Sequence, residues 1–230
     1  RDRPKTASPG PGDYLDLYSR LVEEQGVREI VSIHMTSKGS GAFQAARAAK
    51  SMAKEMFPDI RIEVVDTLNV AMCHGWMVIE AARNALNDRP VSAIVDRIKE
   101  MIPITRMLQT ADTLKYLYMG GRIGRAKHLV ASMLDIKPVI SMEDGEIVSL
   151  GQARTRKKVY ELIVDKLDGF VGQGAVRVAY VHAAAQEEAE RLKTMVEQRV
   201  EVVESVICEL SPALGVHTGP GTVGLCYVPV

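Results

Sequence analysis

A glycine-rich stretch near the C-terminus, from Gly215 to Gly224, combines one histidine and two threonines with four glycines and a proline. Glycine adopts positive φ angles readily and proline fixes φ, so this composition predicts a rigid turn rather than a helix or an interior strand. A turn that presents the imidazole of His217 and two hydroxyls could hold a small anionic group. The alternative is a hairpin or strand-entry turn in which His217 contacts no ligand.

A second candidate is the turn from Thr36 to Gly41, between an expected strand at 29–35 and an expected helix over Ala42–Met56. In an open parallel sheet, ligands bind where a strand ends and the next helix begins. The free N–H groups at the helix start and the hydroxyl of Ser40 suit a carboxylate or a phosphate. The alternative is that Ser40 serves only as the N-cap of the helix.

A third candidate is the stretch 116–125, which holds three glycines and two arginines, Arg122 and Arg125. Arginine stays charged and donates hydrogen bonds in a fork, so such a loop could grip an anion. The alternative is that Gly120 or Gly121 ends a helix and the arginines lie in solvent. The Gly-Gly-x-x-Gly pattern of this loop is by itself weak evidence for nucleotide binding, and the Ser40 turn lacks the spacing of a nucleotide-binding P-loop.

Composition and spacing disfavour several classes of function. The sequence has 29 Lys and Arg against 29 Asp and Glu, which gives no charge excess for binding nucleic acid. The three cysteines and five histidines lack metal-ligand spacing, so we expect no metal site and no disulfide framework. No apolar run reaches the length of a membrane span, so we expect a cytoplasmic protein without stable membrane insertion. No nucleophile has an evident activating partner, so no catalytic residue is assigned.

The elements that must position these candidates follow two different patterns. In the first 88 residues a helix from Asp13, a strand at 29–35, the helix Ala42–Met56, a strand at 60–65 and a helix ending near Leu86 predict a parallel α/β, Rossmann-like subdomain. Residues 89–230 predict a mixed or antiparallel sheet covered by helices. Strands are expected at 104–110, 136–142, 147–150, 176–181, 202–209 and 223–228, with helices at 91–101, 112–118, 126–134, 155–167 and 187–199. The fold class is therefore α/β with two subdomains and a cleft between them.

Taken in order, the candidate motifs form a set that resembles the DegV family of bacterial fatty-acid-binding proteins over essentially the whole chain. The matching pieces are Thr6-x-Ser8-Pro9, Ser37-x-x-Ser40-Gly41-x-x-Gln44-x-Ala46, Val65-Asp66-Thr67, Leu117-x-x-Gly120-Gly121-Arg122-Ile123, Ile136-Lys137-Pro138 with Gly145, and Gly215-x-His217-x-Gly219-Pro220-Gly221. The chain differs from the family at Ala42-Phe43, where Thr-Tyr is usual, and at 71–75, where a Ser-x-Gly-x-Gly-like helix start is usual. It starts at Arg1 rather than at a methionine, and we expect the family's first strand to lie outside it.

The resemblance implies a ligand tunnel between the two subdomains that takes a long-chain fatty acid, with no other cofactor. It implies that Thr6, Ser40 and Gly41 hold the fatty-acid carboxylate, and that Arg122 and His217 lie near this head group. It further implies an acyl carrier without catalytic activity of its own, which presents the carboxylate to a partner fatty-acid kinase for acyl-phosphate formation. Two competing hypotheses are an enzyme that binds a phosphorylated small molecule or nucleotide through the glycine-rich loops, and a DNA-binding regulator, which the neutral charge disfavours.

Overall fold

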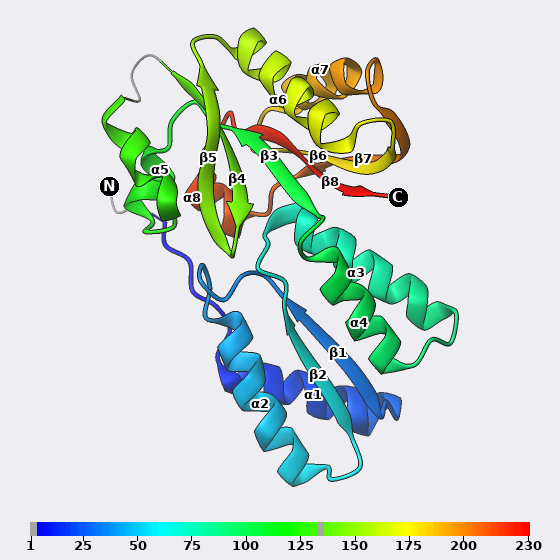
Figure 1. Cartoon of the computed structure of the whole chain (residues 1–230). Coiled ribbons are helices and arrows are strands. Elements are labelled where there is room, and N and C mark those ends of the chain that lie inside the picture. Colours follow the sequence, from blue (N-terminus) through cyan, green and yellow to red (C-terminus); the bar gives the residue numbers. More distant parts are fainter. Residues whose placement is uncertain (1–3, 133–135) are drawn as a thin grey trace. The chain divides into compact units, whose positions relative to one another are not determined.

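The computed structural model describes residues 4–132 and 136–230 (Figure 1). Contacts divide the chain into two compact units. We call Ala7–Val70 with His74–Pro103 the N-terminal unit, and the segment ending at Thr6, Ala71–Cys73 and Ile104–Val230 the C-terminal unit. The division falls at Pro103 rather than between residues 88 and 89. Helix α4 (Val91–Met101) packs against the strands of the N-terminal unit, so it belongs with them.

The N-terminal unit is built on two parallel strands, β1 (Glu29–His34) and β2 (Arg61–Asp66), which pair from Glu29 opposite Arg61 to His34 opposite Asp66. Parallel neighbours need a crossover, and α2 (Ala42–Met56) supplies it. Helix α1 (Pro11–Gln25) packs on α2, and α3 (Ala71–Leu86) follows β2. The small core beneath α1 and α2 consists of Tyr18, Val22, Ala49, Ala53, Ile60 and Ile62.

The C-terminal unit contains a six-stranded sheet with the order β5-β4-β3-β8-β6-β7. Its strands are β3 (Arg106–Thr110), β4 (Lys137–Glu143), β5 (Glu146–Ala153), β6 (Ala175–His182), β7 (Glu201–Glu209) and β8 (Val223–Pro229). Only β6 and β7 pair in parallel, while the other neighbours are antiparallel. The predicted α/β fold class, with a small parallel sheet and a larger mixed sheet, is therefore confirmed.

Helices α6 (Arg156–Val171) and α7 (Gln186–Glu197) cover the larger sheet and bury its main core. Val159, Ile163 and Leu167 follow helical spacing on α6 and are completely buried. The remaining elements are α5 (Lys115–Met119), the 3-10 helix η1 (Gly124–Ser132) and α8 (Pro212–Thr218). The helix expected at 126–134 is thus a 3-10 helix, and residues 133 and 134 lie outside the described residues. Within the described ranges, no helix is long and apolar enough to cross a membrane.

The glycine-rich stretch near the C-terminus differs from the predicted turn at 215–218, whereas the strand expected at 223–228 is confirmed as β8. Its residues 215–218 form the end of helix α8, and Val223 and Gly224 lie in β8, an interior strand. Pro212 starts the helix at a position that needs no N–H, and Gly219 ends it with φ +80. Glycine is needed at position 224 because β3 comes very close there: a Cβ would lie 2.6 Å from the Cα of Gln109. Only 219–222 form the predicted turn.

Candidate functional site

Thr6 and His217 meet in the C-terminal unit. Oγ1 of Thr6 lies 2.7 Å from Nε2 of His217, a hydrogen bond between residues 211 positions apart in the sequence. His217 stands in the last turn of α8, whose C-terminus is closed by a hydrogen bond from the Gly219 N–H to the Gly215 carbonyl (2.8 Å). The sequence resemblance placed both residues near one ligand, and the fold brings them into direct contact.

Gly120 lies against the imidazole of His217, on the side of its Nδ1. A Cβ at position 120 would overlap Nδ1 of His217 and lie 2.9 Å from its Cε1, so only glycine lets α5 approach this closely. Gly219 is approached just as closely by Tyr116 of α5, since a Cβ on Gly219 would lie 2.6 Å from Cε2 of Tyr116. The glycines of both loops therefore serve close packing of α5 on α8.

Arg122 is anchored beside this contact. Its backbone N–H donates to the Leu117 carbonyl (2.9 Å), and its Nη1 donates to the Gly120 carbonyl (2.7 Å). The guanidinium charge acts on His217. Burial chiefly lowers the pKa of His217, and the positive charge of Arg122 lowers it further. The ring is therefore neutral at pH 7, with one donor and one acceptor nitrogen.

One nitrogen of the His217 ring has no hydrogen-bond partner in the described part of the chain. Nδ1 of His217 and Oγ1 of the next residue, Thr218, are buried and form no hydrogen bond among the described residues. Buried polar atoms without partners cost free energy and are uncommon in folded proteins. Their presence beside Thr6 and Arg122 marks this corner of the C-terminal unit as a candidate functional site.

Ser40 and Gly41 lie in the N-terminal unit, at the start of α2. The Thr36 carbonyl accepts hydrogen bonds from the N–H groups of Gly39 (3.1 Å) and Ser40 (3.2 Å), which closes the turn. Oγ of Ser40 accepts from the Ala42 N–H at 3.2 Å, so its hydroxyl proton can still be donated. The N-cap position itself is Gly41, where a Cβ would lie 3.0 Å from Oγ of Ser8. Ser40 thus supports the helix start and retains a donor.

Asp66 holds this turn against the end of the parallel sheet, a role that the sequence analysis missed. Its carboxylate accepts hydrogen bonds from the Ser37 N–H (3.2 and 3.3 Å) and from the Leu68 N–H (3.0 Å). Because Asp66 is the last residue of β2, the turn after β1 is tied to the neighbouring strand end. This is the strand-end location in which open parallel sheets bind ligands.

The predicted site residues thus form two groups. Thr6, Arg122 and His217 come together in the C-terminal unit, and Ser40 and Gly41 lie with Ser8 in the N-terminal unit. Among the described residues, no cluster of three or more His, Cys, Asp or Glu could hold a metal ion. Cys73, Cys208 and Cys226 are not joined in disulfides within the described part of the chain.

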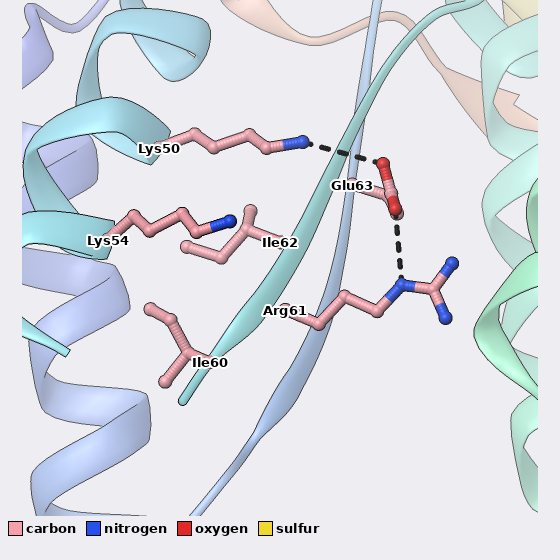
Figure 2. A pocket seen from close by; sticks show the side chains of 6 residues that line it. All are labelled: Lys50, Lys54, Ile60, Arg61, Ile62 and Glu63. Carbon is pink, nitrogen blue, oxygen red and sulfur yellow. Dashed lines mark hydrogen bonds and ion pairs between the residues drawn. The ribbon is translucent and has the colours of Figure 1, made fainter. Parts of the chain in front are cut away.

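A depression of about 230 Å³ lies elsewhere in the N-terminal unit, between α2 and β2 (Figure 2). The depression is lined by four charged residues and two isoleucines: Lys50, Lys54, Arg61, Glu63, Ile60 and Ile62. Nζ of Lys50 lies 3.4 Å from Oε2 of Glu63, and Nε of Arg61 lies 3.2 Å from its Oε1. Part of the positive charge is therefore neutralised within the depression, and it contains none of the predicted site residues.

Comparisons with known proteins agree with this architecture. The sequence profile described as "Uncharacterised protein, DegV family" matches residues 1–230. A DegV domain-containing protein of Streptomyces coelicolor is 33% identical over 225 residues, which cover 97% of this chain and 78% of that protein. A similar protein of Clostridium acetobutylicum is 31% identical over 228 residues, with 97% and 78% covered.

Two solved structures are also similar over nearly the whole chain. A DegV family protein from Thermus thermophilus, described for its fatty-acid binding, has a TM-score of 0.91 at 28% identity, with 99% of this chain and 79% of that chain covered. A stearic acid-binding protein from Eubacterium ventriosum has a TM-score of 0.88 at 26% identity, with 98% and 78% covered. On the match of the whole chain to the family profile and on this likeness in structure, the chain belongs to the DegV family.

Proposed function

We propose that this protein binds a long-chain fatty acid and holds its carboxylate with Thr6, Ser40 and Gly41. The observation that carries the proposal is the likeness of nearly the whole chain to two solved proteins described as binding fatty acids. The hydroxyl and N–H donors at Thr6 and at the start of α2 are of the kind that a carboxylate accepts.

Burial of the acyl chain supplies the driving force in this account. A long-chain acid such as palmitate has about 14 methylenes, and burying each gains about 0.8 kcal/mol, or about 11 kcal/mol as an upper bound. Association and ordering costs offset a substantial part of this gain. Burying the carboxylate costs several kcal/mol unless it is hydrogen-bonded, which is the role we assign to Thr6 and Ser40.

The neutral state of His217 suits this role. With the proton on Nε2, His217 donates to Oγ1 of Thr6, and the Thr6 hydroxyl is then free to donate to the carboxylate. A protonated ring would add a second full charge beside Arg122. Burial and the Arg122 charge both lower the pKa of His217, which favours the neutral donor.

We further propose that the protein has no reaction of its own and carries the acid to a partner fatty-acid kinase. In that reaction a carboxylate oxygen attacks the γ-phosphorus of ATP, the bond to ADP breaks, and an acyl phosphate forms. Arg122 and His217 would then lie near the head group, where a positive charge offsets the negative charge that accumulates during phosphoryl transfer. Because hydroxyl donors, rather than a tight ion pair with Arg122, hold the carboxylate in this proposal, it stays nucleophilic.

A thermal unfolding experiment separates this proposal from its main competitor. The purified protein, stripped of lipid, is heated alone, with palmitate, and with Mg-ATP in the absence of any kinase. We expect palmitate to raise Tm and ATP to leave it unchanged, because only a ligand of the folded state stabilises it. Protection by ATP without protection by palmitate would instead favour an enzyme that binds a nucleotide through its glycine-rich loops.

A further inference from the structure

The turn that follows His217 is held by an ionic pair that the proposed function leaves unused. Arg156, the first residue of α6, donates from Nη1 to the Gly221 carbonyl at 2.9 Å. Its Nη2 donates to Oδ1 of Asp112 at 2.6 Å, and Asp112 also accepts from Nζ of Lys137 at 2.6 Å. One arginine therefore joins the turn to the segment before α5 and to the start of α6.

The fit between Asp112 and Gly221 is close. Gly221 has φ +78, and a Cβ there would overlap Oδ2 of Asp112 and lie 3.4 Å from Nη2 of Arg156. Glycine is thus required at position 221 both for its backbone conformation and for this approach. Asp112, Tyr116 and Gly120 contact Gly221, Gly219 and His217 respectively, so the segments 112–120 and 217–221 run past each other in opposite directions.

The turn is connected to His217 through its backbone. Oγ1 of Thr222 donates to the carbonyl of Thr218, the residue after His217, at 3.0 Å. On its other side the turn is tied to Ala183, which accepts from the Gly221 N–H and donates to the Thr222 carbonyl, each at 2.9 Å. The Ala183 bonds fix where the turn lies, and Arg156 fixes which way the Gly221 carbonyl points.

The charges of the pair are maintained at neutral pH. Burial alone would raise the pKa of Asp112, but the hydrogen bond from Lys137 and the charge of Arg156 outweigh it and lower that pKa. Arg156 also contacts the hydroxyl of Tyr160, which itself donates to Glu188 at 2.9 Å. The guanidinium therefore contacts Asp112, the Gly221 carbonyl and Tyr160, and these three contacts fix its orientation.

We propose that Asp112 and Arg156 are positioning residues that fix the turn at 219–221 and, through it, the direction in which His217 presents its imidazole to Thr6. This inference rests on the proposed function, because it assigns a purpose to the Thr6–His217 contact in holding the ligand head group. It adds two residues that lie outside the set which the sequence predicted.

The test compares Arg156→Ala, Arg156→Lys and Asp112→Asn with wild type by NMR of the histidine side chains in ligand-free protein, with the His217 signals assigned from His217→Gln. Arg199→Ala is the matched control. Like Arg156, Arg199 forms ion pairs with aspartate, in its case Asp165 and Asp168, and it lies in the same unit but away from the turn. We expect the pKa of His217 to rise toward its ordinary value in Arg156→Ala and Asp112→Asn, because the ring becomes more exposed. Arg156→Lys should restore part of the wild-type value.

A second readout is the affinity for palmitate. We expect Arg156→Ala to raise Kd about tenfold and Arg199→Ala to leave it unchanged. If the His217 signals and pKa of Arg156→Ala and Asp112→Asn match those of Arg199→Ala, the positioning role is overturned. If wild-type protein fails to bind palmitate, the proposed function fails, and the NMR comparison still decides whether the pair positions His217. Asp112→Asn keeps the side-chain size, so it provides the decision should Arg156→Ala fail to fold.

Discussion

Oγ1 of Thr6 is hydrogen-bonded to Nε2 of His217 at 2.7 Å, which joins the start of the described chain to the end of α8. The two residues belong to the same compact unit, although 211 positions separate them. In the function that we propose, the Thr6 hydroxyl binds the carboxylate and the neutral imidazole of His217 sets the direction of the hydroxyl proton.

Ser40→Ala should weaken fatty-acid binding by about 1–3 kcal/mol, since it removes a hydroxyl donor from a site that must desolvate a carboxylate. Isothermal titration with palmitate measures the change. Ser51→Ala is the matched control, because Ser51 is exposed on the same helix and its hydroxyl donates to the Arg47 carbonyl within that helix. Equal affinity in wild type and Ser40→Ala would remove Ser40 from the carboxylate site.

His217→Ala should reduce phosphorylation of the bound acid by a partner kinase more than it reduces binding of the acid. The reason is that, in the proposed function, His217 acts on the head group through Thr6, whereas the acyl chain would supply most of the binding free energy. Initial rates of acyl-phosphate formation and palmitate Kd are measured on the same preparation. A variant that loses binding entirely while its residual complex is phosphorylated at the normal rate would reverse the assignment.

Gly120→Ala should lower the free energy of unfolding by about 1–3 kcal/mol, because the added methyl overlaps the His217 ring and overpacking strains the contact between α5 and α8. Gly169→Ala in helix α6 is the control, since a Cβ there meets nothing within 4 Å and alanine favours the helix by about 0.5–1 kcal/mol. Urea unfolding measures both. Similar effects of the two substitutions would show that Gly120 is not in close contact with His217.

Folding stability should fall as the pH drops below about 6.5, the ordinary pKa of histidine. Burial is the main cause that lowers the pKa of His34, His74 and His217, and the neighbouring His74 lowers that of His34 further. The unfolded chain therefore binds protons before the folded one does, so stability is fully present above the unfolded pKa and is lost as the pH falls toward the folded values.

Urea unfolding at pH 7.5 and pH 5.5 measures this dependence. The matched variant is His74→Gln, which can still donate to the Ile33 carbonyl that Nε2 of His74 contacts at 3.0 Å, and it should depend less on pH than wild type. Equal pH dependence in the two proteins would mean that His74 is not held neutral by burial.

Most of the fold could be predicted from local sequence patterns. The alanine-rich segment after the first strand predicted α2, and the helix expected at 91–101 is α4, whose Val91, Ile94, Ile98 and Met101 are buried at helical spacing. Residues 215–218 were wrongly predicted because their composition favours a turn, whereas Pro212 starts a helix there; the strand expected at 223–228 is β8. Tertiary packing overrides local preference at such positions.

The candidate site could be predicted only in part. The resemblance named Thr6 and His217, but no local pattern indicates that residues 211 positions apart share a hydrogen bond. Asp112 and Arg156 were missed because each looks like an ordinary surface charge until the fold brings both to Gly221. The signal available was the spacing of Gly219 and Gly221, which marks a backbone approached closely by another segment.

Native mass spectrometry of the purified protein, followed by denaturation and organic extraction, measures whether it binds a long-chain fatty acid as we propose. We expect one long-chain fatty acid per chain, released on unfolding. A protein that is purified without lipid and takes up neither added palmitate nor oleate would contradict the proposal.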